Sequence, residues 1–216
     1  MSGLILWEES EDFRSWKRGV TRTAPQPFPC IPVFQAFWPD SQKVELVFPD
    51  TGKEVEMELA DVAGYYAALI PGKEVPSYQY RVTWPDGTVR MEGDPYRFAP
   101  VISKKDTDRF AAGIHYEAYN MLGAHVRTID GIKGVHFAVW APNALRVSVV
   151  GDFNHWDGRV HQMRRLWDSG IFELFIPGEL EGQNYKYELK TKGGLTYLKA
   201  DPYAFSQQLR PDTASV

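Results

Sequence analysis

Two stretches of the chain decide the fold: SYQYRVTWPDGTVRMEGDPYRF at residues 77–98 and NYKYELKTKGGLTYLKADPYAF at residues 184–205. They align without a gap at a constant offset of 107 positions, and seven of the 22 aligned positions are identical. The shared positions are two tyrosines, one glycine and the closing Asp-Pro-Tyr-x-Phe. A gap-free match of this length indicates two copies of one module, each of about 80–100 residues.

Within each copy the hydrophobic residues recur with a period of two, which is the spacing of half-buried β-strands. The alternation is clear at 44–48 in the first copy and at 135–139, 172–176 and 185–189 in the second. Clusters of Gly, Pro, Asp and Asn separate these runs, as turns separate short strands. The predicted fold class is all-β, with two tandem immunoglobulin-like β-sandwiches.

One segment between the two copies departs from the period of two. After Asp106, a predicted N-cap, apolar residues recur every four positions from Phe110 to Leu122. This spacing predicts a helix over 107–122 that ends at Gly123 and joins the two sandwiches as a short helical linker.

The same reasoning divides the whole chain. The predicted organisation is an N-terminal arm at 1–24, a first sandwich at 25–105, a linker helix at 106–122 and a second sandwich at 123–216. Within the arm, the charged stretch 7–18 is expected to be a short helix or a ragged arm. The proline-rich stretch 21–32 is expected to be extended.

Composition excludes several classes of function. The 216 residues carry 24 basic and 28 acidic side chains, so the net charge of −4 disfavours a nucleic-acid or membrane-surface role. No run approaches 18 apolar residues, and the acidic start does not resemble a signal peptide. The single Cys30 excludes an internal disulfide framework and a cysteine-cluster zinc site. A reducing compartment is expected, and therefore a cytoplasmic location.

The sequence offers no recognisable catalytic centre. It contains no Gly-x-Ser-x-Gly, no phosphate-binding glycine loop and no His-Glu-x-x-His. The five histidines all lie in the second half, and no pair of them shares a helical face. We therefore predict no catalytic residues, no metal site and no cofactor for this chain.

The most informative turn is GDFNHWDG at residues 151–158, which follows a predicted strand. Phe153 is expected to pack inward, which leaves Trp156 in the loop beside Asn154. In one interpretation Trp156 only covers the edge of the sandwich, with its indole N–H bonded to a loop carbonyl. In the other it is a flat platform for the C–H face of a sugar ring, while Asn154 and Lys186 bond the hydroxyl rim.

The internal repeat provides a control for these two interpretations. The first copy has Phe48-Pro-Asp-Thr-Gly52 in place of the turn, without a tryptophan, and Gln79 in place of Lys186. A purely structural turn would be needed in both copies, so its restriction to the second copy favours binding. Covering roughly 100 Å² of sugar at ~25 cal/mol per Å² contributes ~2–3 kcal/mol. Such a site is weak and needs several contacts along a polymer.

The second half resembles the carbohydrate-binding module of family 48 as it occurs in glycogen branching enzymes. The resemblance is carried by Leu122-Gly-Ala-His125, Val135–Asn143, Val147–Arg159, Gly170–Gly178, Asn184–Tyr187, Leu198–Phe205 and Leu209–Ser215. The first half looks like the extra N-terminal module of the long bacterial branching enzymes. It differs at its start, where Pro25–Phe34 replaces a Leu-Gly-x-His element.

The resemblance implies a function and a ligand site. Branching enzymes cut an α-1,4-glucan and rejoin the piece through an α-1,6 bond, using a retaining pair of carboxyl groups in a (β/α)₈ barrel of about 250 residues. The implied partners of this chain are α-1,4-glucan, as glycogen or maltooligosaccharide, and the catalytic barrel of a parent enzyme. In the family's sugar site, Trp156 and Lys186 match two of three positions. Tyr197 is the substitute for a missing second tryptophan.

Three hypotheses follow. The chain is the non-catalytic N-terminal part of a branching enzyme, or a free-standing glucan-binding adaptor, or an interaction scaffold without sugar affinity. The first hypothesis predicts an exposed apolar patch where a barrel would dock, and the second predicts a polar surface all round.

Overall fold

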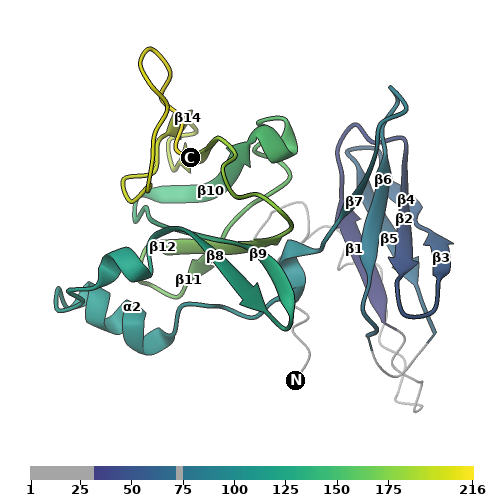
Figure 1. Cartoon of the computed structure of the whole chain (residues 1–216), viewed down its shortest axis with the longest axis horizontal. Coiled ribbons are helices and arrows are strands. Elements are labelled where there is room, and N and C mark those ends of the chain that lie inside the picture. Colours follow the sequence, from purple (N-terminus) through teal and green to yellow (C-terminus); the bar gives the residue numbers. More distant parts are fainter. Residues whose placement is uncertain (1–31, 72–74) are drawn as a thin grey trace.

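The computed structural model describes residues 32–71 and 75–216, and it shows two β-sandwiches side by side (Figure 1). The predictions for the N-terminal arm and for Cys30 lie outside the described residues. No helix in the described part of the chain is long and apolar enough to cross a membrane.

The first sandwich consists of two antiparallel sheets. One has the strand order β1-β5-β4, and the other has the order β3-β2-β6-β7. The strands are β1 Val33–Phe37, β2 Lys43–Phe48, β3 Lys53–Glu56, β4 Glu58–Asp61, β5 Tyr65–Leu69, β6 Gln79–Thr83 and β7 Val89–Glu92.

The second sandwich has sheets of order β10-β13-β14 and β11-β12-β9-β8, also antiparallel. Its strands are β8 Gly123–Ile129, β9 Ile132–Trp140, β10 Ala144–Gly151, β11 Arg164–Leu166, β12 Ile171–Pro177, β13 Tyr185–Thr191 and β14 Thr196–Lys199. The order β2-β6-β7 in the first sandwich corresponds to β10-β13-β14 in the second, and β4-β5-β1 corresponds to β11-β12-β9. The predicted all-β fold is confirmed, and the sequence repeat is a repeat of topology.

Each sandwich has its own core, formed by the alternating residues that the sequence singles out. In the first, Val44, Leu46 and Phe48 are buried together with the aromatic side chains of β1 and β6. In the second, the inward faces of β9, β10, β12 and β13 supply the core. Burial of these apolar side chains is the main stabilising contribution to each module.

The identical residues of the repeat form the same buried cluster in both copies, which we call the Tyr-Tyr-Asp cluster. In the second copy the Tyr185 and Tyr187 hydroxyls lie 2.7 and 3.0 Å from the carboxylate of Asp201. The other Asp201 oxygen accepts the backbone N–H of Tyr203 at 2.8 Å. Burial raises the pKa of Asp201 although the hydroxyl hydrogen bonds oppose it. The cluster fixes strand β13 to the turn that follows β14.

In the first copy Asp94 plays the same part. It accepts the Tyr78 hydroxyl at 2.6 Å and the N–H of Tyr96 at 2.8 Å, which starts the short helix η2 Pro95–Arg97. The Tyr80 hydroxyl donates to the Gln35 carbonyl at 2.9 Å and lies 3.4 Å from Asp94.

The Asp-Pro-Tyr-x-Phe of the first copy also joins the two sandwiches. The Tyr96 hydroxyl donates to the Val160 carbonyl and accepts the N–H of Gln162, each at 3.0 Å. Phe98 is 1% exposed and packs edge-on against Phe175, with ring centroids 4.7 Å apart. The motif that closes one module is therefore the motif that binds it to the next.

The linker helix differs from the prediction. Helix α2 runs over Lys104–Ala111, capped by Ser103 rather than Asp106, and ends before Gly113, whose φ is +71°. Only a short helix η3, Ala118–Asn120, follows. The four-residue spacing continues past Gly113, but glycine in this left-handed conformation ends the helix.

The helix also lies elsewhere than expected. It packs against the second sandwich on the side away from the first (Figure 1), where Phe110 contacts Trp140 edge-on. The segment that contains it covers the outer face of the β9–β12 sheet through Ile102, Met121 and Leu122. This cover explains why β12 is buried on both faces instead of alternating.

Glu173 on β12 holds this cover in place. Its carboxylate accepts the backbone N–H groups of Val101 and Ile102, each at 3.0 Å, and lies 3.0 Å from Nε2 of His136. His136 is fully buried, and burial lowers its pKa in spite of the adjacent carboxylate. A buried acceptor thus satisfies the donors of the chain leaving the first sandwich.

Removal of the Asp201 carboxylate should destabilise the second sandwich strongly. Asp201→Ala leaves two buried tyrosine hydroxyls and one backbone N–H without their acceptor, so we expect a loss of ~3–5 kcal/mol in the free energy of unfolding. Asp94→Ala should destabilise the first sandwich by a smaller amount, because the Tyr80 hydroxyl keeps its acceptor in the Gln35 carbonyl. Urea unfolding followed by circular dichroism measures both effects. Asp212→Ala, at an exposed side chain, is the control, and an equal loss there would contradict the role of the cluster.

Candidate functional site

The turn that follows strand β10 has an unusual backbone. A short helix η4, Asp152–Asn154, is followed by His155 and Trp156, whose φ angles are +54° and +61°. The Trp156 N–H donates to the Gly151 carbonyl at 3.0 Å, which closes the turn. Two successive left-handed residues other than glycine are uncommon, and such strain persists only where the surroundings hold it.

Asn154 supplies most of that support, and this corrects its predicted role at the sugar rim. It is 6% exposed, and its Oδ1 accepts the N–H of Gly151 at 2.9 Å. Its Nδ2 donates to the Val149 carbonyl and lies 2.9 Å from Nδ1 of His161. The amide is engaged in hydrogen bonds inside the protein, so the role of Asn154 is to shape the turn.

His161 also supports the turn, through its hydrogen bond with Asn154. Its Nδ1 accepts from Asn154, which places the ring proton on Nε2. Full burial lowers the pKa of His161 to about 4. The ring also meets Trp38 of the first sandwich edge-on, with centroids 6.4 Å apart. The base of the turn is therefore also part of the contact between the two sandwiches.

Trp156 is held by a hydrogen bond at its indole N–H and is partly exposed. Its Nε1–H donates to Oδ1 of Asp152 at 3.1 Å, and Oδ2 of Asp152 accepts both the backbone N–H and the Nδ2–H of Asn184, at 3.1 and 2.9 Å. The side chain is nevertheless 37% exposed. The indole N–H is bonded, as the edge-covering interpretation requires, but to a carboxylate. The partial exposure of Trp156 leaves room for the sugar-platform interpretation.

Lys186 lies on β13, opposite Val150 of β10, two residues beyond the Asn184 that anchors Asp152. Its side chain is on the outer face of the sheet, since Tyr185 and Tyr187 point into the core. The ammonium donates to the Thr213 hydroxyl at 2.7 Å. The structure therefore brings Trp156 and Lys186 to one end of the β10–β13 pair, joined through Asp152 and Asn184.

Tyr197 is not part of this group. In the β13–β14 register Tyr197 lies opposite Leu189, which packs against the core, and so it is on the other face of the sheet from Lys186. Leu198 lies opposite Glu188 and shares the face of Lys186, with 47% of its surface exposed. Sequence reasoning missed Leu198, because the turn length that sets the register decides which of two neighbouring residues faces out.

No group of three or more His, Cys, Asp or Glu side chains suited to a metal ion occurs among residues 32–71 and 75–216.

Two family models match separate parts of the chain. Residues 121–204 match the family described as carbohydrate-binding module 48 (isoamylase N-terminal domain). Residues 27–96 match the family described as the alpha-1,4-glucan branching enzyme GlgB, N-terminal domain. Both families are non-catalytic modules of glucan-active enzymes, and the pair is consistent with the N-terminal region of a branching-enzyme-like protein.

Among solved structures, the chain is similar to pullulanases. The pullulanase of Anoxybacillus sp. LM18-11 complexed with maltotetraose is 18% identical over 88% of this chain and 25% of its own, with a TM-score of 0.39. The apo pullulanase of Klebsiella pneumoniae is 21% identical over 84% of this chain and 22% of its own, with a TM-score of 0.38. The chain thus spans about a quarter of the length of these enzymes.

The structure of the turn predicts that Asn154 contributes more to the stability of the protein than Trp156 does. Asn154→Ala removes three hydrogen bonds to buried groups and should lower the free energy of unfolding by ~2–4 kcal/mol. Trp156→Ala removes a partly exposed ring and one hydrogen bond to a carboxylate, and should lower it by ~1 kcal/mol, less than Asn154→Ala. Urea titrations of the two variants test this, and a Trp156 loss as large as that of Asn154 would show that the ring is structural.

The buried His161 predicts acid sensitivity. Its pKa is about 4 when folded against an ordinary value of 6.5, so the unfolded chain binds more protons between these values. Stability should therefore fall as the pH drops from about 6.5, and the His161 contribution should level off below about 4. Calorimetry at pH 7 and pH 5 measures the effect. His161→Gln should show a smaller difference in melting temperature than the native chain, and an unchanged difference would contradict the assignment.

Proposed function

We propose that this chain, the N-terminal region of a branching-enzyme-like protein, binds α-1,4-glucan through Trp156 and Lys186. The observation that carries the proposal is the partly exposed indole of Trp156, hydrogen-bonded to Asp152, at the same end of the β10–β13 pair as the outward-facing Lys186. The strained turn presents the ring and an Asp152–Asn184 bridge fixes it, so little conformational entropy is lost on binding.

The chemistry suits a sugar ring. The indole covers the C–H face of a pyranose, and the Lys186 ammonium donates to its hydroxyls. Leu198 extends the apolar surface on the Lys186 face, in the place that the sequence assigned to Tyr197. An area of roughly 100 Å² at ~25 cal/mol per Å² contributes only ~2–3 kcal/mol, so useful affinity requires a polymer with many rings.

For the parent activity we propose transfer of α-1,4-glucan segments to form α-1,6 branches. The match of residues 27–96 to the branching-enzyme N-terminal domain supports this activity over debranching. The role of this chain is then to hold glucan for a catalytic domain, in the cytoplasm, as the single cysteine of the sequence suggests. A glucan-binding adaptor or a scaffold without sugar affinity are the alternatives that the experiments below separate.

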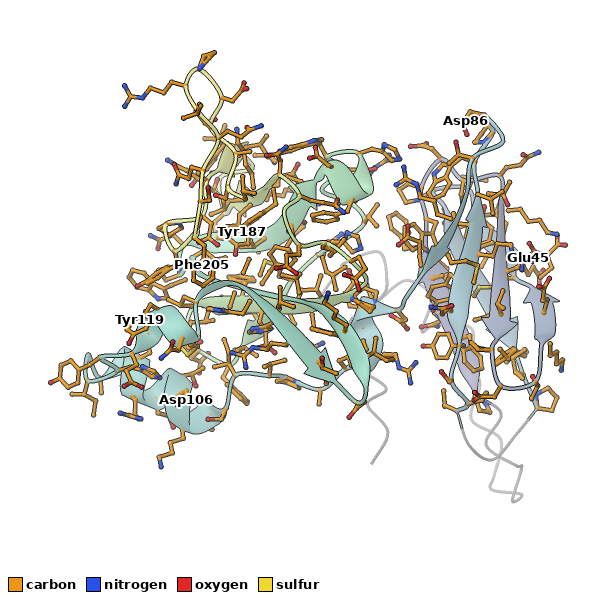
Figure 2. All side chains as sticks on the ribbon, viewed as in Figure 1. Glu45, Asp86, Asp106, Tyr119, Tyr187 and Phe205 are labelled. Carbon is orange, nitrogen blue, oxygen red and sulfur yellow. The ribbon has the colours of Figure 1, made fainter. Side chains whose placement is uncertain are left out.

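A catalytic barrel is the proposed partner, and the repeat indicates where it would dock. Tyr96 and Phe98 of the first copy contact the second sandwich. The equivalent Tyr203 and Phe205 are 38% and 77% exposed. Phe205 lies at the edge of the second sandwich, on the same side as Tyr119, which is 58% exposed (Figure 2). By analogy with the first copy, this face is the one that receives the following domain.

Glycogen binding tests the proposal directly. In native electrophoresis through a glycogen-containing gel, the chain should be retarded relative to a glycogen-free gel. Trp156→Ala and Lys186→Ala should each weaken the retardation, with a roughly tenfold or greater loss of affinity for Trp156→Ala.

Matched controls are available elsewhere on the surface. Trp167, 48% exposed, and Lys105 on α2 are exposed residues of the same types, and Trp167→Ala and Lys105→Ala should migrate like the native chain. If the native chain is not retarded, glucan binding is wrong and the scaffold hypothesis stands.

The docking face predicts binding to a barrel supplied separately. A purified catalytic domain of a bacterial branching enzyme, without its own N-terminal modules, should associate with this chain in analytical ultracentrifugation. Phe205→Ser should weaken the association at least tenfold, since it removes a large apolar contact. Leu59→Ser, at a half-exposed residue of the first sandwich, is the control. No association of the native chain would favour the adaptor.

A further inference from the structure

The contact between the two sandwiches leaves a groove of about 200 Å³. Both modules line it, and the residues that matter to its chemistry are Trp38, Trp84, Arg90, Glu92, His155 and Asp157. The groove borders the Trp156 turn, because His155 directly precedes Trp156 in the chain. Neither module forms this groove alone.

The walls of the groove are held by contacts across the joint. Trp84 meets Trp38 edge-on at 6.3 Å and His155 of the other module at 6.4 Å, measured between ring centroids. Arg159 lies 2.5 Å from Asp40 of the first sandwich and 2.8 Å from Asp157 of its own, so one guanidinium ties the two modules together. The groove is therefore already formed without a ligand.

Glu92 is the unexplained group in this groove. It lies on the edge strand β7 opposite Tyr80, so its side chain is on the inward face of the sheet. Within the described chain its carboxylate has no hydrogen-bond donor and no ion-pair partner. Burial raises the pKa of Glu92 to about 7, and the positive charge of nearby Arg90 opposes this rise. Glu92 is partly buried in the groove wall, and its carboxylate is free to accept hydrogen bonds from a ligand placed there.

The surrounding charges restrict what that ligand is. Arg159 pairs with both Asp40 and Asp157, so this group keeps a net negative charge. The Arg90 guanidinium lies 5.8 Å from the centroid of the Trp84 ring. The Glu92 carboxylate repels an anion, and an apolar ligand would leave it unpaired. A neutral molecule with hydroxyl donors and a C–H face satisfies both Glu92 and the indole of Trp84. The volume is below the ~300–1,000 Å³ of drug-sized sites, which suits a single ring.

We propose that this groove between the modules is a second carbohydrate site, in which Trp84 contacts one hexose ring and Glu92 accepts its hydroxyl hydrogens. That the ring belongs to an α-glucan rests on the function proposed above. Because both modules contact the ring, its binding also stabilises the joint between them. The groove and Trp156 together offer two contacts to one polymer, which raises its apparent affinity.

The test uses the full chain labelled with ¹⁵N, with maltotriose as the probe. Each tryptophan gives its own indole N–H signal, so Trp84 and Trp156 report separately. In Trp156→Ala, where the first site is removed, maltotriose should still shift the Trp84 signal in a saturable manner. Adding Glu92→Gln should weaken that response at least threefold, whereas adding Glu58→Gln, at an exposed carboxylate of the same sandwich, should not change it.

The pH dependence gives a second measurement on the native side chain. A sugar hydroxyl donates better to the ionised carboxylate, so the affinity read at Trp84 should increase as the pH rises through about 7. Glu92→Gln should abolish this increase.

The outcomes separate the two proposals. If maltotriose saturates the Trp156 signal while the Trp84 signal stays unchanged, the groove is not a sugar site, and the function proposed for Trp156 stands. If Trp84 responds and Trp156 does not, the groove stands and the Trp156 site is wrong. A Trp84 response that Glu92→Gln leaves unaltered would overturn the role of Glu92.

Discussion

A buried carboxylate shared by two tyrosine hydroxyls is the constraint on which both sandwiches depend. Asp94 and Asp201 each connect a central strand to the turn that closes the module, and each caps that turn with its second oxygen. In the first copy this turn also carries Tyr96 and Phe98 into the second sandwich. A buried carboxylate needs hydrogen-bond donors around it, so the segments that carry those donors are fixed in position. The cluster of the first copy therefore fixes both the closing turn of its module and the contact of that turn with the second sandwich.

The turn that carries Trp156 is held rigid by the contact between the two sandwiches. His161 lies at the base of the Trp156 turn and also contacts Trp38 of the first sandwich, so the turn and the joint are supported by the same residue. Asn154 holds two left-handed residues in place and thereby presents the indole of Trp156. A platform that needs no rearrangement suits weak, repeated contacts with a polymer. It also explains why the turn occurs only in the second copy, where a neighbouring module supports it from below.

The sequence predicted the strands well and the side-chain directions less well. The period of two and the 107-residue offset identified the sandwiches and the tyrosines of the shared cluster. Asn154 was misplaced because a turn residue can face either way, and Tyr197 because the face of a strand depends on a register set by its hairpin. The helix was drawn too long because apolar spacing continues beyond Gly113, where only the backbone conformation ends it. The burial of β12 on both faces could not be predicted from the sequence pattern, because it depends on which segment covers the outer face of the sheet.

The central claim is that glucan binds on the exposed indole of Trp156 beside Lys186, and a crystal structure of the chain with maltoheptaose tests it most directly. The account predicts a glucose ring stacked on Trp156, with the Lys186 ammonium turned from the Thr213 hydroxyl toward a sugar hydroxyl. A saturating complex in which no sugar touches Trp156, while its indole remains open to solvent in the crystal, would contradict it.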